Sequence, residues 1–131
     1  MSEDNAEILR LFYEIDPESA DLLQYLDPEV ELYPGIKAPD QGDRYVGREG
    51  WSEFIAGAIG AWESVEIEPR DRLEAGDDRI LAIDRWIFRG RYGIELEREL
   101  PTLFTFRNGL VVRIDGFIDE DEAREAAGLS S

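Results

Sequence analysis

The chain has 131 residues, 43% of them apolar and 11% aromatic, which suits one domain with a core of its own. Its formal net charge of −17 repels nucleic acid phosphates and anionic lipid headgroups, so neither nucleic acid nor a membrane surface is an expected partner. Because it has no Cys and no His, disulfides, thiolate nucleophiles and Cys- or His-based metal sites are excluded, and acid–base chemistry is left to Asp, Glu, Tyr, Arg and Lys37.

The sequence also bears on location. No apolar run approaches the ~20 residues that span a bilayer. The acidic start, residues 1–5, lacks the basic end and apolar stretch of a secretory signal. We therefore expect a cytoplasmic protein that forms a single domain over residues 1–131. Salt adaptation is an explanation of the acidic surplus that composition leaves open.

The first third of the chain predicts two helices and a strand. The first helix has one apolar face: Ile8, Leu11, Phe12 and Ile15. Asp16 is placed as the N-cap and Pro17 as the first residue of a second, short helix. That helix carries three leucines, Leu22, Leu23 and Leu26. Residues 30–33 alternate and predict a strand.

A loop over residues 34–46 precedes the clearest helix. Whether the loop is functional or only a solvated connection stays open. The helix has one wide apolar face: Trp51, Phe54, Ile55, Ala58, Ile59 and Trp62. This face is interrupted by Gly50, Gly57 and Gly60, and each glycine lowers the stability of the helix by about 1 kcal/mol relative to Ala. Close approach to another element would explain them, and chance composition is the alternative.

From residue 65 the apolar period becomes two, which predicts an antiparallel sheet. Val65, Ile67 and Leu73 alternate with charged residues before a turn at 76–78. Residues 79–90 form a long strand that is apolar on both faces. The next strand has one inward face: Leu100, Thr102, Phe104 and Phe106.

The last two elements follow a hairpin signal. Asn108-Gly109 favours a tight turn, because both turn positions need a positive φ. The strand after it has one apolar face: Leu110, Val112, Ile114 and Ile118. Asp119 caps a terminal helix that Gly128 ends. Helices followed by a run of strands predict an α+β fold, with a long helix lying over a curved antiparallel sheet.

This order, and four local segments, resemble the SnoaL-like branch of the nuclear transport factor 2 superfamily over nearly the whole chain. The segments are LDPEVELYP (26–34), YVGREG (45–50), FTFRNGLVVRI (104–114) and DEDEAREAAG (119–128). The resemblance implies a cone-shaped α+β barrel, in which a curved sheet wraps round the long helix and leaves a pocket at its open end. The family includes ketosteroid isomerases, polyketide cyclases, limonene epoxide hydrolases and members without known activity, so the fold alone leaves the function open.

The resemblance also implies a homodimer through the outer face of the sheet. The strand 79–90 favours the same arrangement, because a strand exposed on one side should alternate with polar residues. A small hydrophobic molecule, apolar or polycyclic, is the expected ligand. We expect no cofactor and no metal.

Enzymes of this superfamily place carboxylates in an apolar pocket, and Asp84 is the candidate for such a catalytic acid–base group. It stands in the middle of a strongly apolar strand, where an unpaired charge is costly. Two alternatives stay open: an ion pair with an arginine on a neighbouring strand, such as Arg113, or a place on the outer face at a dimer interface.

The epoxide hydrolases offer a more specific comparison, which this chain does not fit. Their catalytic Asp matches Gly116, whereas here Asp115 lies one residue earlier and is expected to point outward. Arg85 matches their arginine, but the position two residues later, where they have a catalytic carboxylate, is occupied here by Ile87. The hydrolase triad is therefore absent.

Other side chains are candidates for lining a ligand site. They are Tyr13, Tyr33, Trp51, Arg85, Thr102 and Phe104. Packing in the core is the alternative for each aromatic residue. We therefore expect a SnoaL-like small-molecule binding protein, with a cofactor-free isomerase, cyclase or hydrolase that uses a buried carboxylate as the alternative.

Overall fold

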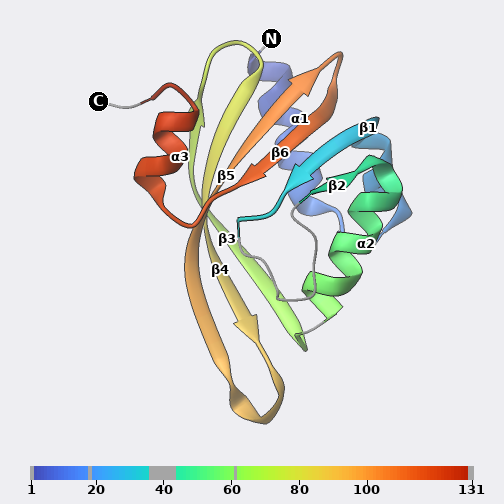
Figure 1. Ribbon diagram of the computed structural model, residues 1–131, viewed down its shortest axis with the longest axis vertical. Helices are drawn as coiled ribbons and strands as arrows, with labels where there is room; N and C mark the ends of the chain where they lie inside the picture. The colour runs from blue at the N-terminus through green and yellow to red at the C-terminus, as the bar shows by residue number, and fades with distance from the viewer. Residues whose placement is uncertain (1, 18, 36–43, 61, 130–131) are drawn as a thin grey trace.

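The computed structural model describes residues 2–17, 19–35, 44–60 and 62–129 (Figure 1). Its elements in chain order are α1 (Ser2–Glu14), the 3-10 helix η1 (Ala20–Tyr25), β1 (Leu26–Tyr33), β2 (Tyr45–Val46), α2 (Gly47–Gly60), β3 (Ser64–Glu74), β4 (Arg79–Arg89), the 3-10 helix η2 (Arg91–Gly93), β5 (Glu95–Arg107), β6 (Leu110–Gly116) and α3 (Glu120–Ala126). The predicted α+β class is confirmed.

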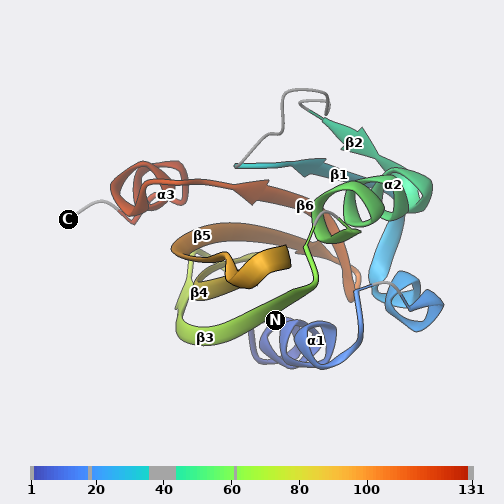
Figure 2. The ribbon, with the colours of Figure 1, turned by 90° about the horizontal axis from the view of Figure 1, so that it is seen from below.

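Six strands form one curved sheet in the order β2-β1-β6-β5-β4-β3 (Figure 2). The sheet does not close into a barrel, because β2 and β3 remain its two edges. Neighbouring strands are antiparallel except β1 and β6, which run parallel. The expectation of an entirely antiparallel sheet is therefore wrong at this pair. A parallel pair needs a long crossover, and the chain from α2 to β5 provides it.

The two faces of the sheet are covered by different helices. We call the face packed against α1 and α2 the inner face and the face packed against α3 the outer face. The buried residues of the inner core are Leu9, Phe12, Leu22, Leu26, Val30, Leu32, Trp51, Ile55, Ile80, Ala82, Phe104, Phe106, Val111 and Ile114. The smaller outer core consists of Ala75, Leu81, Ile83, Leu103, Ala123 and Ala127. The two-sided apolar pattern of β4 thus has an explanation within one chain, since Leu81 and Ile83 pack beneath α3.

The N-terminal helices differ in detail from the sequence prediction. The core side of α1 is centred on Leu9 and Phe12, which are 1% and 8% exposed, rather than on Leu11. The second helix is only a 3-10 turn. Its N-cap is Ser19, whose hydroxyl accepts the backbone N–H of Asp21 at 3.1 Å. Asp16 is not its cap, and Leu26 already belongs to β1.

Two register shifts change which residues face the core. Between Pro69 and Asp71 the pairing of β3 with β4 slips by one residue, so Leu73 pairs with Leu81 on the outer face. A second shift follows Thr105, and it brings Val111 into the inner core in place of Val112. Residue 118 lies beyond β6, and its side chain is 68% exposed.

The predicted turn, cap and close approach are found. Asn108 and Gly109 have φ of 54° and 78°, as the hairpin requires. The Asp119 carboxylate caps α3 by accepting the backbone N–H of Asp121 at 3.0 Å. A Cβ on Gly50 would lie 3.1 Å from the Tyr45 carbonyl carbon, whereas one on Gly60 would meet nothing within 4 Å. Close approach therefore explains Gly50 and not Gly60.

Candidate functional site

A fully buried carboxylate stands at the centre of the candidate site. Asp84 lies on the inner face of β4 and is 0% exposed. The Tyr13 hydroxyl of α1 donates to its Oδ2 at 2.6 Å, and Arg72 Nη1 of β3 donates to its Oδ1 at 2.6 Å. The Arg72 guanidinium also lies over the Tyr13 ring, 4.7 Å from its centroid. We call Tyr13, Arg72 and Asp84 the buried triad.

The bulge in β3 brings Arg72 to this position. Regular alternation from Val65 and Ile67 would turn Arg72 to the outer face. The slip after Pro69 reverses that parity and sets Arg72 opposite Ala82, next to Asp84 on the same face. The expected alternative of an arginine partner on a neighbouring strand is found, but the partner is Arg72 and not Arg113. A proline inside a strand marks an edge or a bulge, and it was the signal that could have pointed to Arg72.

The triad satisfies a charge that could not otherwise be buried. An isolated carboxylate in an apolar interior is strongly destabilising, and a guanidinium partner with a second hydrogen bond compensates it. Burial, and then the neighbouring Asp84 carboxylate, raises the pKa of the Tyr13 phenol well above its usual value, while Arg72 opposes that rise. Tyr13 is therefore a neutral hydrogen-bond donor at physiological pH. Since 32% of the Arg72 side chain is exposed, Arg72 links the buried carboxylate to the surface.

An aromatic surface continues from the triad along the same face of β4. Trp86 and Phe88 stack with their ring centroids 5.8 Å apart and an interplanar angle of 20°. Trp62, just before β3, lies 5.3 Å from the Phe88 ring. We call these three half-buried rings the aromatic strip. Partly buried apolar residues pair with its β4 members in the register of the neighbouring strands: Val65, Ile67 and Leu96.

Four of the predicted site residues come together, two of them within the triad and two beside it. They are Tyr13, Asp84, Thr102 and Phe104. Thr102 pairs with Ala82 and so shares the face of Asp84. The Phe104 ring packs edge-on against Tyr13 at 6.0 Å between centroids, within the inner core.

Three predicted ligand contacts lie elsewhere. Trp51 is 8% exposed in the inner core, and its Nε1 donates to the Pro17 carbonyl at 3.3 Å. Arg85 lies on the opposite face of β4 from Asp84 and donates to Glu97 at 2.7 Å. Tyr33 donates to Glu31 at 2.6 Å and lies beneath Arg113, whose guanidinium is 4.4 Å from the ring centroid. These positions place Arg85 and Tyr33 on the outer face.

The end of β6 has no room for an inward side chain. A Cβ on Gly116 would lie 2.6 Å from the Gly35 backbone nitrogen, because the two chains touch there. Asp115 shares the outer face with Leu103 and accepts from Arg113 Nε at 2.9 Å. The outward position expected for Asp115 is therefore confirmed, and close packing explains why residue 116 is a glycine.

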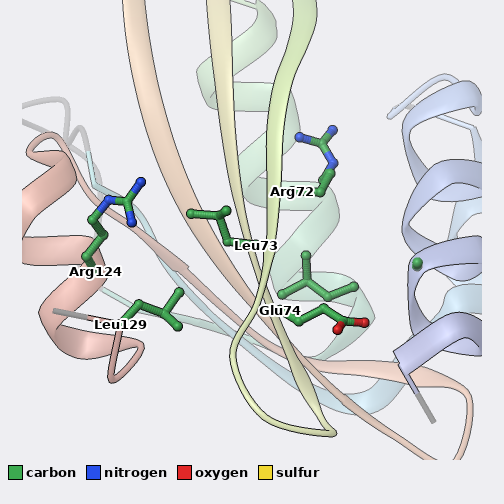
Figure 3. A pocket seen from close by; sticks show the side chains of 7 residues that line it. Arg72, Leu73, Glu74, Arg124 and Leu129 are labelled. Atoms are coloured by element: carbon green, nitrogen blue, oxygen red, sulfur yellow. The ribbon is translucent and has the colours of Figure 1, made fainter. Parts of the chain in front are cut away.

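The described residues form two surface hollows, one of which borders the triad at Arg72. The larger, of about 560 Å³, borders Arg72 and Glu74 on the α1 side of β3, and Arg124 and Leu129 on the α3 side (Figure 3). It wraps round the edge strand and does not enclose a cavity. The smaller, of about 250 Å³, lies between η1 and α2 beside Trp51.

Within residues 2–17, 19–35, 44–60 and 62–129, no group of three acidic side chains is suited to hold a metal ion. Over the same ranges no helix has both the length and the apolar character needed to cross a membrane.

Solved structures with the same fold are numerous, and three illustrate their range. TerC, co-crystallised with polyporic acid, is 21% identical with a TM-score of 0.74, over 95% of this chain and 98% of that chain. An NTF2-like protein of unknown function from Burkholderia pseudomallei K96243 is 19% identical with a TM-score of 0.72, over 93% and 95%. RV0760c from Mycobacterium tuberculosis, in complex with estradiol-17β-hemisuccinate, is 18% identical with a TM-score of 0.68, over 90% and 92%.

The sequence comparisons identify the family. A search of the curated proteins finds no match to this chain. The family model of the SnoaL-like domain matches residues 10–114, a range that begins in α1, includes the whole buried triad and ends in β6. The chain therefore belongs to the SnoaL-like domain family.

Proposed function

We propose that this protein binds a small, largely apolar molecule on the inner face of its sheet, between the buried triad and the aromatic strip. One observation carries the proposal: a fully buried carboxylate holds Tyr13 and Arg72 beside half-buried aromatic rings. Small-molecule sites are typically lined by apolar and aromatic side chains with a few fixed polar groups, and the residues of this region have that composition.

Asp84 acts in this proposal as a positioning residue. Its carboxylate is 0% exposed and each oxygen accepts a hydrogen bond from the protein, so it is screened from a ligand. It fixes the Tyr13 hydroxyl and the Arg72 guanidinium instead. Arg72 has further N–H groups and is partly exposed, so it is the polar group of the triad that a ligand can reach.

The first probes follow from structures of the same fold. TerC was crystallised with polyporic acid and RV0760c with estradiol-17β-hemisuccinate. We expect at least one of these compounds to change the intrinsic fluorescence of the three tryptophans, with saturation at micromolar concentrations. The Phe88→Ala variant, which shortens the aromatic strip, should weaken that binding about tenfold.

The matched control is Tyr92→Ala. Tyr92 is an aromatic residue at the hairpin tip between β4 and β5, and it is 97% exposed. Its removal should leave binding unchanged. Equal effects of the two substitutions, or no binding of either probe, would count against a ligand site on the inner face.

Catalysis by Asp84 is the second candidate function, and the short bond from the Tyr13 phenol supports it. A phenol and a carboxylate 2.6 Å apart in an apolar setting are a pair that can move a proton. We would follow conversion of a β,γ-unsaturated ketosteroid to its conjugated isomer by ultraviolet absorbance. If wild type turns over and Asp84→Asn binds the steroid equally well without turnover, Asp84 is catalytic. If neither protein turns it over, this isomerase activity is ruled out.

We also propose a homodimer through the outer face of the sheet. This face carries arginines and glutamates that form ion pairs within the chain: Arg70–Glu99, Arg85–Glu97 and Arg89–Glu95. A two-fold axis can bring these charged side chains opposite those of the other sign in a second copy. Sedimentation at micromolar concentration should give about twice the 15.0 kDa chain mass, and Arg85→Glu should lower it. A monomer at all concentrations would contradict the proposal.

A further inference from the structure

We propose that the occupant of the inner-face site is a flat conjugated molecule with a carbonyl-type oxygen, which accepts a hydrogen bond from the indole N–H of Trp86. This inference rests on the proposed function and specifies the ligand class. It assigns Trp86 as the residue that selects ligands with an acceptor over ligands of the same shape without one.

The first observation is an unused hydrogen-bond donor. Trp86 Nε1 is buried and, within the part of the chain that the structure describes, is the one buried side-chain nitrogen or oxygen without a hydrogen-bond partner. An indole N–H can only donate, and burying it without an acceptor forfeits its bonds to water. A buried donor left in this way is stabilised by an acceptor that the described residues do not supply, and a ligand oxygen is such an acceptor.

Other donors near the inner core do have partners. Trp51 Nε1 donates to the Pro17 carbonyl at 3.3 Å, and the Tyr13 hydroxyl donates to Asp84 at 2.6 Å. The core therefore satisfies its aromatic donors elsewhere. Trp86 differs from them because it belongs to the half-buried aromatic strip at the edge of that core.

The charges around Trp86 favour an acceptor. Arg98 lies opposite Trp86 in the register of β4 with β5, and Arg72 lies beyond it on the same face. Asp84, a carboxylate on the same face of β4, is 0% exposed and is held by Tyr13 and Arg72. A ligand oxygen with partial negative charge is stabilised in such surroundings, whereas a ligand N–H would face two arginines and could not reach the buried Asp84 carboxylate.

The shape of the strip favours a flat ring. Trp86 and Phe88 present nearly parallel rings, with 20° between their planes. Trp62 extends the surface beyond Phe88 and packs close to the backbone of Gly90, where a Cβ would meet its ring at 3.3 Å. Planar aromatic molecules make the largest contact with a surface of this kind.

A matched pair of probes tests the inference. Fluorenone and fluorene have the same three-ring frame, and only fluorenone has a carbonyl oxygen. We would titrate each into protein with ¹⁵N-labelled tryptophan and follow the three indole N–H signals, with Trp86 assigned from its absence in Trp86→Phe. Fluorenone should move the Trp86 signal downfield and bind about fivefold more tightly than fluorene.

The variant separates the donor from the ring. Trp86→Phe keeps an aromatic side chain and removes the N–H, so it should abolish the preference for fluorenone while fluorene still binds. If this variant fails to fold, the Trp86 signal is assigned by elimination from Trp51→Phe and Trp62→Phe, and the two probes on wild type then carry the test. Equal affinities with an unmoved Trp86 signal would overturn the inference and leave the proposed function standing. If neither compound binds, the ligand class is wrong, and the fluorescence titrations with the larger probes decide separately whether the site exists.

Discussion

At the scale of single residues, the two partners of the ion pair are buried unequally. Asp84 is 0% exposed and the Arg72 side chain is 32% exposed. Removing Arg72 leaves a carboxylate with no access to water and no counter-charge. Removing the charge of Asp84 leaves a guanidinium that can still reach solvent. The same pair therefore predicts two different losses of stability.

We expect Arg72→Met to lower the free energy of unfolding by about 3–5 kcal/mol, the range for an uncompensated buried charge. Asp84→Asn should lower it by about 1–3 kcal/mol, because the amide still accepts from Tyr13. Urea unfolding followed by circular dichroism measures both. Arg70→Met is the control, since its side chain is 56% exposed and pairs with Glu99 at the surface. A smaller loss for Arg72→Met than for Asp84→Asn would contradict this account.

Tyr13 predicts a dependence of stability on pH in the alkaline range. Its pKa in the folded protein is raised, first by burial and then by Asp84. Above pH ~10 the unfolded chain releases the phenol proton while the folded protein keeps it. Stability due to Tyr13 is therefore present below that pH and declines as pH rises, by at most about 1.4 kcal/mol per pH unit. Tyr13→Phe should decline less steeply between pH 10 and 11, and parallel curves would refute this role.

At the scale of elements, the contact between β6 and the residues after β1 predicts a sharp response to one methyl group. Gly116→Ala places a Cβ 2.6 Å from the Gly35 nitrogen, and two backbone segments must move apart. We expect a loss of about 1–3 kcal/mol. Gly60→Ala at the end of α2 meets nothing within 4 Å and should be neutral or stabilising. Thermal unfolding compares them, and equal melting temperatures would contradict the close packing.

Periodicity predicted the elements well because each helix and strand buries one face of its own residues. Asp84 was found from sequence because a charge within an apolar strand is conspicuous. Its partner Arg72 was not, because the register slip after Pro69 depends on how β3 meets β4. The inward position of Val111 was not predicted either, because it depends on the register shift between β5 and β6. The alternation of apolar and polar residues is a property of a single strand, whereas a bulge is defined by how two strands pair.

Face assignments were also limited by what covers each face. The apolar outer side of β4 indicated a dimer interface with a second copy of the chain. In the structure Ala123 and Ala127 at α3 cover part of this side instead. A seven-residue helix at the end of the chain carries too few apolar positions to show where it docks. Pairing of distant elements is information that local patterns do not contain.

At the scale of the whole molecule, the acidic charge should dominate the response to salt. The chain has 31 acidic and 14 basic residues, so folding brings many like charges together. Surface ion pairs such as Arg89–Glu95 oppose this repulsion, but exposed pairs contribute little. Raising the ionic strength from 0.01 to 0.1 M shortens the screening length from about 30 to about 10 Å, which weakens the long-range repulsion most.

We therefore expect the free energy of unfolding to rise over this interval of NaCl and to level off at higher salt, as measured by urea titration at pH 7. Arg89→Gln removes one cation from the outer-face ion pairs and raises the net negative charge, so its stability should rise more steeply with salt than that of wild type. A fall in stability with added salt would mean that attractive pairs outweigh the net charge, and the weakening should then be smaller in Arg89→Gln. The sign of the slope in the two proteins thus decides between general repulsion and specific pairing as the larger electrostatic contribution to this fold.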